Sequence, residues 1–225
     1  MPDLADSHPA RGQAHSALAH QFDDLEQQHE AASLGMWVFL VTEILFFGGL
    51  FLTYLVYRTW YPEAFGHASR TLDLFWGATN TAVLITSSLT MALAVFASQT
   101  GNRNTTVAFL LATLALGLVV LGIKAIEYAH TFQEHHVPGP GFQFEGPQPQ
   151  HAEIFFSLYF VMTGLHALHL VIGVGIMTVM AVMAWRGRFS AEYHNPIEVS
   201  GLYWHFVNIV WFFLFPLLYL ISRHR

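Results

Sequence analysis

Glu43 is the only charged residue in the apolar stretch 34–57, and its carboxyl could bind and release a proton inside a membrane. An ionisable group near the middle of a bilayer costs about 2.5 to 3.5 kcal/mol on insertion scales, so Glu43 is expected to face other protein. No basic residue is expected at a comparable depth. The pattern therefore predicts a carboxyl that is protonated and hydrogen-bonded inside a helical bundle.

Other polar side chains also fall within or beside apolar stretches, and they are predicted to make polar contacts between helices. His166 and His169 are one turn apart, and His205 and Asn208 are three residues apart, so each pair shares a helix face. The predicted set of interhelical contacts is Asn80, Glu127, Glu153, His166, His169, His205 and Asn208.

Histidine would have to supply any haem or metal ligand, because the chain has 14 histidines and no cysteine. A bis-histidine haem would pair His166 or His169 with His205, but the first two lie on one helix, so only one of them could reach the iron. The Glu-x-x-His pattern of di-iron sites occurs at 26–29 and 127–130, which are expected on opposite faces of the membrane. No catalytic residue, metal site or cofactor is therefore predicted in this chain.

The elements that position these residues are apolar stretches long enough to cross a hydrocarbon core of about 30 Å. The predicted fold is all-α, a polytopic membrane protein with a bundle of five transmembrane helices at about 34–57, 73–98, 105–129, 152–185 and 198–222. Residues 1–33 carry six acids and one arginine and are predicted to be a polar N-terminal tail, followed by the transmembrane domain at 34–225.

Charge and helix number suggest how the chain sits in its membrane. An odd number of spans places the two termini on opposite sides, and the loop at 129–151 contains no Lys or Arg, which favours the outer side for that loop. The N-terminus is then expected inside. A net charge of −6 argues against a nucleic-acid partner. The absence of repeated halves argues against an independent transporter.

Several long stretches resemble subunit III of the haem–copper respiratory oxidases. They are GMWVFLVTEILFFGGLF around Glu43, WGATNTAVLITSS at 76–88, IKAIEYAH at 123–130, HAEIFFSLYFVMTGLHALHLVIGV at 151–174 and YWHFVNIVWFFLFPLLYL at 203–220. The resemblance covers about residues 34–221 and all five expected helices. It matches the five-helix form of the family, which lacks the first two helices of the seven-helix form.

The resemblance implies a non-catalytic accessory subunit of a proton-pumping terminal oxidase, which reduces oxygen to water with electrons from cytochrome c or quinol. Haem and copper would belong to oxidase subunit I, the main partner, beside other oxidase subunits and bound phospholipid. The family's carbodiimide-reactive glutamate falls on Glu43, which becomes the predicted functional carboxyl. Trp204 and Trp211 are expected to contact lipid or a neighbouring subunit.

The implied location is a bacterial plasma (inner) membrane, with the N-terminus cytoplasmic and the C-terminus periplasmic. The subunit would stabilise the catalytic subunit and support proton uptake. The alternative within the same family is an accessory protein of a nitric oxide reductase.

Overall fold

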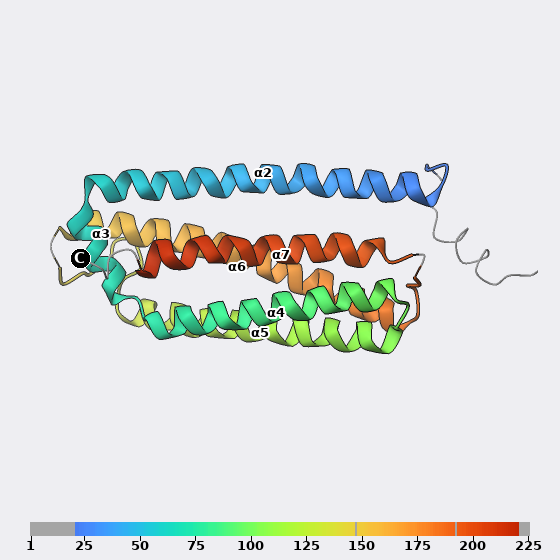
Figure 1. The fold of residues 1–225 in the computed structure, drawn as a ribbon. Coiled ribbons are helices and arrows are strands. Elements are labelled where there is room, and N and C mark those ends of the chain that lie inside the picture. Colours follow the sequence, from blue (N-terminus) through green and yellow to red (C-terminus); the bar gives the residue numbers. More distant parts are fainter. Residues whose placement is uncertain (1–20, 147, 192, 221–225) are drawn as a thin grey trace, which may run out of the picture.

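In a computed structural model of the chain, long helices run side by side as a bundle (Figure 1). The structure describes residues 21–146, 148–191 and 193–220. Its helices are α2 (Leu25–Trp60), α3 (Pro62–Thr71), α4 (Leu74–Gln99), α5 (Arg103–Gln133), α6 (Pro149–Trp185) and α7 (Asn195–Phe215), and the π-helical turn η1 (Pro216–Leu220) continues α7. Five of the helices are long and apolar enough to cross a membrane, which confirms the predicted all-α membrane bundle.

The first spanning helix begins at Leu25, not at Leu34 as hydropathy predicted. Asp24 caps this helix, because its side chain accepts a hydrogen bond of 2.7 Å from the backbone N–H of Gln27. Residues 25–33 are polar but rich in good helix formers, so the helix continues beyond its apolar part. Of the expected polar tail, residues 1–20 lie outside the described residues.

The short helix α3 was not expected from the sequence. Pro62 begins it, and the buried residues Ala64, Phe65 and Ala68 lie on one face at helical spacing. Phe65 packs edge-to-face on Tyr54 of α2 and on Phe155 of α6. The connection between the first two spanning helices is therefore a packed element rather than an open loop.

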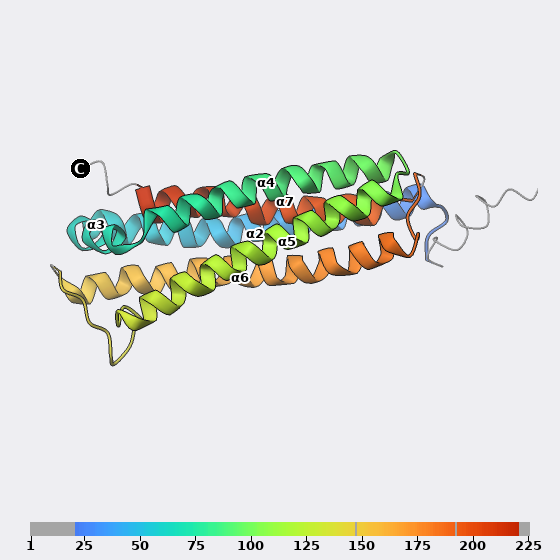
Figure 2. The ribbon, with the colours of Figure 1, turned by 90° about the horizontal axis from the view of Figure 1, so that it is seen from below.

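Helix α7 lies in the middle of the bundle, and α2 runs along one side of it (Figure 1). In the most apolar window of α7, 56% of the residues are buried, against 17% in α2. Helices α4 and α5 form an antiparallel pair on the other side, joined by a turn in which Gly101 has the left-handed φ of 71°. Figure 2 shows α6 beside α5, with α7 and α2 behind them.

The bundle has two ends, which are named here by the termini. At the C-terminal end lie α3, residues 134–146 of the loop after α5, and η1. At the N-terminal end lie the start of α2, the α4–α5 turn and the start of α7 (Figures 1 and 2). The last spanning helix continues to Leu220. Its geometry changes from α-helical to π-helical at Pro216. Proline lacks a backbone N–H and cannot make the regular α-helical bond, which accounts for the change.

Candidate functional site

Glu43 of α2 and His169 of α6 face each other near the middle of their helices. Glu43 Oε2 lies 3.3 Å from His169 Nε2, although the contact lacks the alignment of a good hydrogen bond. The two side chains are 19% and 14% exposed, so the pair lies near the surface of the bundle. The expectation that no basic residue lies at the depth of Glu43 is therefore wrong.

The other ring nitrogen of His169 fixes the chemistry of this pair. Nδ1 lies 2.8 Å from the backbone carbonyl of Leu165, and a carbonyl can only accept, so Nδ1 carries a proton. Nε2 is then the ring nitrogen that faces the Glu43 carboxyl, and each of these two groups is able to bind a proton. Tyr203 of α7 donates to the backbone carbonyl of His169 at 2.9 Å, which links the pair to the central helix.

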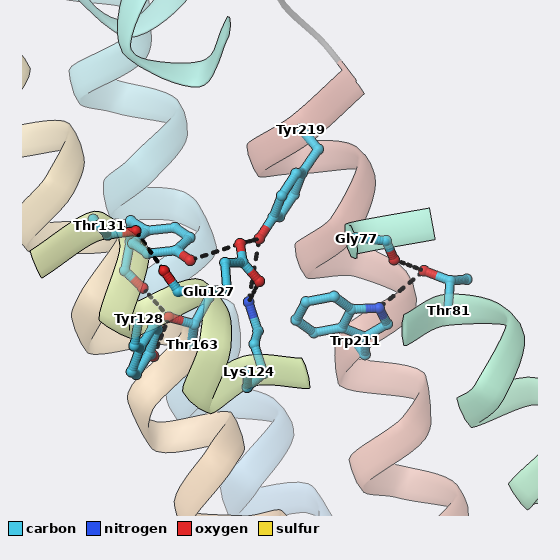
Figure 3. Close-up of polar contacts among 10 residues, drawn as sticks. Gly77, Thr81, Lys124, Glu127, Tyr128, Thr131, Thr163, Trp211 and Tyr219 are labelled. Carbon is cyan, nitrogen blue, oxygen red and sulfur yellow. Dashed lines mark hydrogen bonds and ion pairs between the residues drawn. The ribbon is translucent and has the colours of Figure 1, made fainter. Parts of the chain in front are cut away.

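A second ionisable cluster lies nearer the C-terminal end and is centred on Glu127 of α5 (Figure 3). Glu127 Oε2 accepts a hydrogen bond of 2.8 Å from Lys124 Nζ, and Oε1 accepts one of 2.9 Å from the hydroxyl of Tyr159 on α6. The hydroxyl of Tyr219 on η1 also donates to Oε1 and receives a bond of 3.2 Å from Lys124. We call these four residues the Lys124 cluster.

Only part of this cluster could be recognised from the sequence. Lys124 and Glu127 are three residues apart, so they share a helix face, and that spacing could have identified the ion pair. Tyr159 and Tyr219 lie 32 and 92 residues from Glu127, and no local pattern connects them to it.

A ladder of side-chain contacts joins α4 to α7. The indole N–H groups of Trp204 and Trp211 donate to the hydroxyls of Ser87 and Thr81 at 2.8 and 2.9 Å. Both tryptophan side chains are completely buried within the chain. The expected contact of Trp204 and Trp211 with lipid or another subunit is therefore wrong, because their rings fill the space between helices of this chain.

Two further predicted residues take part in the same ladder. His205 Nδ1 lies 2.7 Å from the hydroxyl of Ser88, and the side-chain amide of Asn208 donates to the backbone carbonyl of Leu84 at 3.4 Å. Both contacts reach from α7 to α4. They place His205 and Asn208 in helix-to-helix contacts.

The remaining predicted contacts differ from expectation. Glu153 at the start of α6 accepts a hydrogen bond of 3.0 Å from the backbone N–H of Gly139, so its partner is the loop and not another helix. His166 packs against Trp211, with ring centroids 5.3 Å apart. His166 and Asn80 are buried, and within the described residues their side-chain polar atoms have no hydrogen-bond partner.

Within residues 21–146, 148–191 and 193–220, no group of three or more His, Asp or Glu side chains is arranged to hold a metal ion. The two Glu-x-x-His patterns lie near the start of α2 and near the end of α5, at opposite ends of the bundle (Figure 1). They cannot share a di-iron centre.

Comparison with known proteins gives matches over nearly the whole chain. The family described as cytochrome c oxidase subunit III matches residues 20–223. Cytochrome c oxidase subunit 3 of Thermostichus vulcanus is 32% identical over 209 residues, which cover 89% of this chain and 92% of that protein. Cytochrome bo(3) ubiquinol oxidase subunit 3 of Pseudomonas aeruginosa is 30% identical, covering 92% and 95%. The human cytochrome c oxidase subunit 3 is 31% identical, covering 82% and 67%.

Proposed function

Because the chain belongs to the cytochrome c oxidase subunit III family, we propose that it is the accessory subunit III of a proton-pumping terminal oxidase in a bacterial plasma membrane. It stabilises the catalytic subunit and supports proton uptake while that subunit reduces oxygen to water. Haem and copper belong to the catalytic subunit, and the N-terminus of this chain faces the cytoplasm.

The observation that carries this proposal is the pairing of Glu43 with His169. Their side chains lie 3.3 Å apart near the middle of α2 and α6, and they are 19% and 14% exposed at the edge of the bundle. A protonatable pair in that position can exchange a proton with a neighbouring subunit without opening the helix core, which is closed by the α4–α7 ladder. Intramembrane ionisable residues commonly mark proton relays.

A groove between α2 and α7 supports bound phospholipid as a further partner. Its volume is about 400 Å³, and apolar side chains, including Ile44, Phe47 and Phe51 from α2 and Phe206 and Phe213 from α7, line it. Acyl chains are apolar and narrow enough for such a groove. The outward face of α2 is also apolar and suits either lipid or the catalytic subunit, as shown by its exposed residues Leu34, Val38, Val41, Leu45, Leu52 and Leu55.

The electron donor is either cytochrome c or quinol. Relatives named for both kinds of oxidase match this chain with 32% and 30% identity over similar lengths. The choice must therefore be made from the partners.

Co-purification tests the proposed function. An affinity tag on the N-terminal tail is expected to bring down an oxidase catalytic subunit with haem and copper, together with oxygen-reducing activity. Recovery of a nitric oxide reductase instead would establish the alternative. Recovery of the chain alone, with substrate flux in liposomes that contain only this chain, would replace both with an independent transporter.

A further inference from the structure

A polar cleft opens at the C-terminal end of the bundle, beside the junction of α3 with α4 and the last turns of α5. Its volume is about 440 Å³. Ionisable side chains from three parts of the chain line it, namely Arg70, Asp73, Glu127, His130, Glu134 and His136. The cleft differs from the α2–α7 groove, whose lining is apolar.

Glu127 belongs both to this cleft and to the buried Lys124 cluster. Its side chain is only 6% exposed, yet it forms part of the cleft wall, whereas Lys124 does not. Thr131, one turn further along α5, also lines the cleft and donates to the backbone carbonyl of Glu127 at 2.9 Å. Glu127 is thus the member of the ion pair that borders the cleft.

Aromatic rings surround the Lys124 ammonium in addition to its carboxylate partner. Its Nζ lies 4.7 Å from the ring centre of Trp211, and 5.4 to 5.8 Å from those of Tyr159, Tyr219 and Tyr128. Contacts of an ammonium with aromatic faces are favourable, because the ring face carries partial negative charge. The ammonium would thus keep favourable contacts if Glu127 lost its negative charge.

The hydroxyls of Tyr159 and Tyr219 can hydrogen-bond the Glu127 carboxyl in either of its protonation states. Tyr159 and Tyr219 both donate to Oε1 of an ionised Glu127. A hydroxyl can donate or accept, so either tyrosine can turn its proton away and accept from a protonated carboxyl. Neither protonation state of Glu127 leaves a buried polar atom of this cluster without a partner.

We infer that Glu127 is a second proton-binding site, which exchanges protons with water in the C-terminal cleft, separately from the Glu43–His169 pair. In the exchange, a hydronium ion in the cleft transfers its proton to the Glu127 carboxylate and leaves as water, while Lys124 remains an ammonium. The inference concerns this chain's own residues and holds for either kind of oxidase partner.

Several ionisable groups face this site and would influence its titration. Lys124 and Tyr128 lie on its own helix, Tyr159 on α6 and Tyr219 on η1, and His166 lies within electrostatic range of Lys124. The cleft adds Arg70, Asp73, His130, Glu134 and His136.

Water access is tested with cysteines in this naturally cysteine-free chain. The test variant is Thr131→Cys, and the control is Thr113→Cys. Both replaced threonines are buried on α5 and donate a hydroxyl hydrogen bond to the backbone carbonyl four residues earlier. Only Thr131 lines the cleft. In the purified complex, a charged, water-borne thiol reagent should label Thr131→Cys and leave Thr113→Cys unlabelled, as read from the mass of this chain. Two unlabelled thiols would show that the cleft excludes water and would overturn the inference.

Proton binding is tested by infrared difference spectra of the same complex, taken between acid and neutral pH at fixed redox state. A carbonyl band of protonated carboxyl is expected that disappears in Glu127→Gln and persists in Glu43→Gln. If Glu127→Gln does not assemble, Tyr219→Phe gives the assignment, because loss of the hydroxyl on Oε1 must shift the frequency of that band. Identical spectra in wild type and the assembled variant would make Glu127 a fixed structural ion and overturn the inference.

Discussion

A carbon atom added to Gly117 of α5 would lie 2.7 Å from Cη2 of Trp204, which reaches across from α7. On the other side of the indole, a carbon added to Gly173 of α6 would lie 3.0 Å from the same ring. The ring therefore lies in a slot between two glycines, while its N–H bonds Ser87 on α4. One side chain thus fixes the spacing of four helices, in the way that small residues permit close packing in membranes.

Gly117→Ala should destabilise the chain, because the new methyl group overlaps an indole ring that has no free space to move into. Overpacking of this kind costs about 1 to 3 kcal/mol. Gly122→Ala on the same helix is the matched control, since nothing lies within 4 Å of its added carbon. Thermal unfolding of the purified protein should show a lower midpoint for the first variant only. Equal midpoints would mean that the slot is looser than the structure indicates.

Lys124→Met should be destabilising, because Glu127 must then either stay ionised without its positive partner or take up a proton from the cleft. Removing one member of a buried ion pair typically costs about 3 to 5 kcal/mol. The double variant Lys124→Met with Glu127→Gln should recover much of that loss, since no uncompensated charge remains. The amounts of assembled protein and the unfolding midpoints of the two single variants and the double variant give the coupling energy. A double variant as unstable as the sum of the singles would argue against a direct pair.

The number of spanning helices could be predicted from the sequence because hydropathy reports directly on membrane burial. The start of α2 at Leu25 could not, since a capped polar helix leaves no trace in hydropathy. Helix α3 was missed for a similar reason, because its ten residues mix apolar and polar side chains around one buried face. Hydropathy thus marks the spans, while the ends and short connections depend on capping and local packing.

The candidate site was predictable only in its individual residues. Glu43 and His169 were both identified, but their pairing depends on the rotation of α2 and α6 about their axes, which the apolar pattern of either helix leaves open. Trp204 and Trp211 were assigned outward for the same reason. Which side of a membrane helix faces protein is decided by neighbours far away in the sequence.

The chain purified without its partners should show no haem absorption. The two histidines nearest each other on α6 have different environments, since His166 packs on Trp211 and His169 faces Glu43. His205 contacts Ser88, so its partner differs from those of His166 and His169. An absorption spectrum of the isolated chain tests this directly. A Soret band that survives purification of the single subunit would restore the bis-histidine haem hypothesis.

Glu43→Gln should leave the haem content of the assembled oxidase intact and should speed the loss of activity during turnover. Gln cannot bind and release a proton, so the pair loses its carboxyl while the packing around it is kept. Glu153→Gln is the matched control, because it also removes a carboxylate, but from a loop contact with Gly139. Oxygen consumption followed over many turnovers gives the inactivation rate of each complex.

A second substitution separates the pair from Glu43 alone. If Glu43 and His169 act as one unit, Glu43→Gln combined with His169→Gln should inactivate no faster than Glu43→Gln, because the first change has already removed the carboxyl that faces His169. Additive rates would mean that His169 contributes independently, for example through the carbonyl contact of its own backbone with Tyr203. An inactivation rate of Glu43→Gln equal to that of wild type would contradict the protective role, whatever the double variant does.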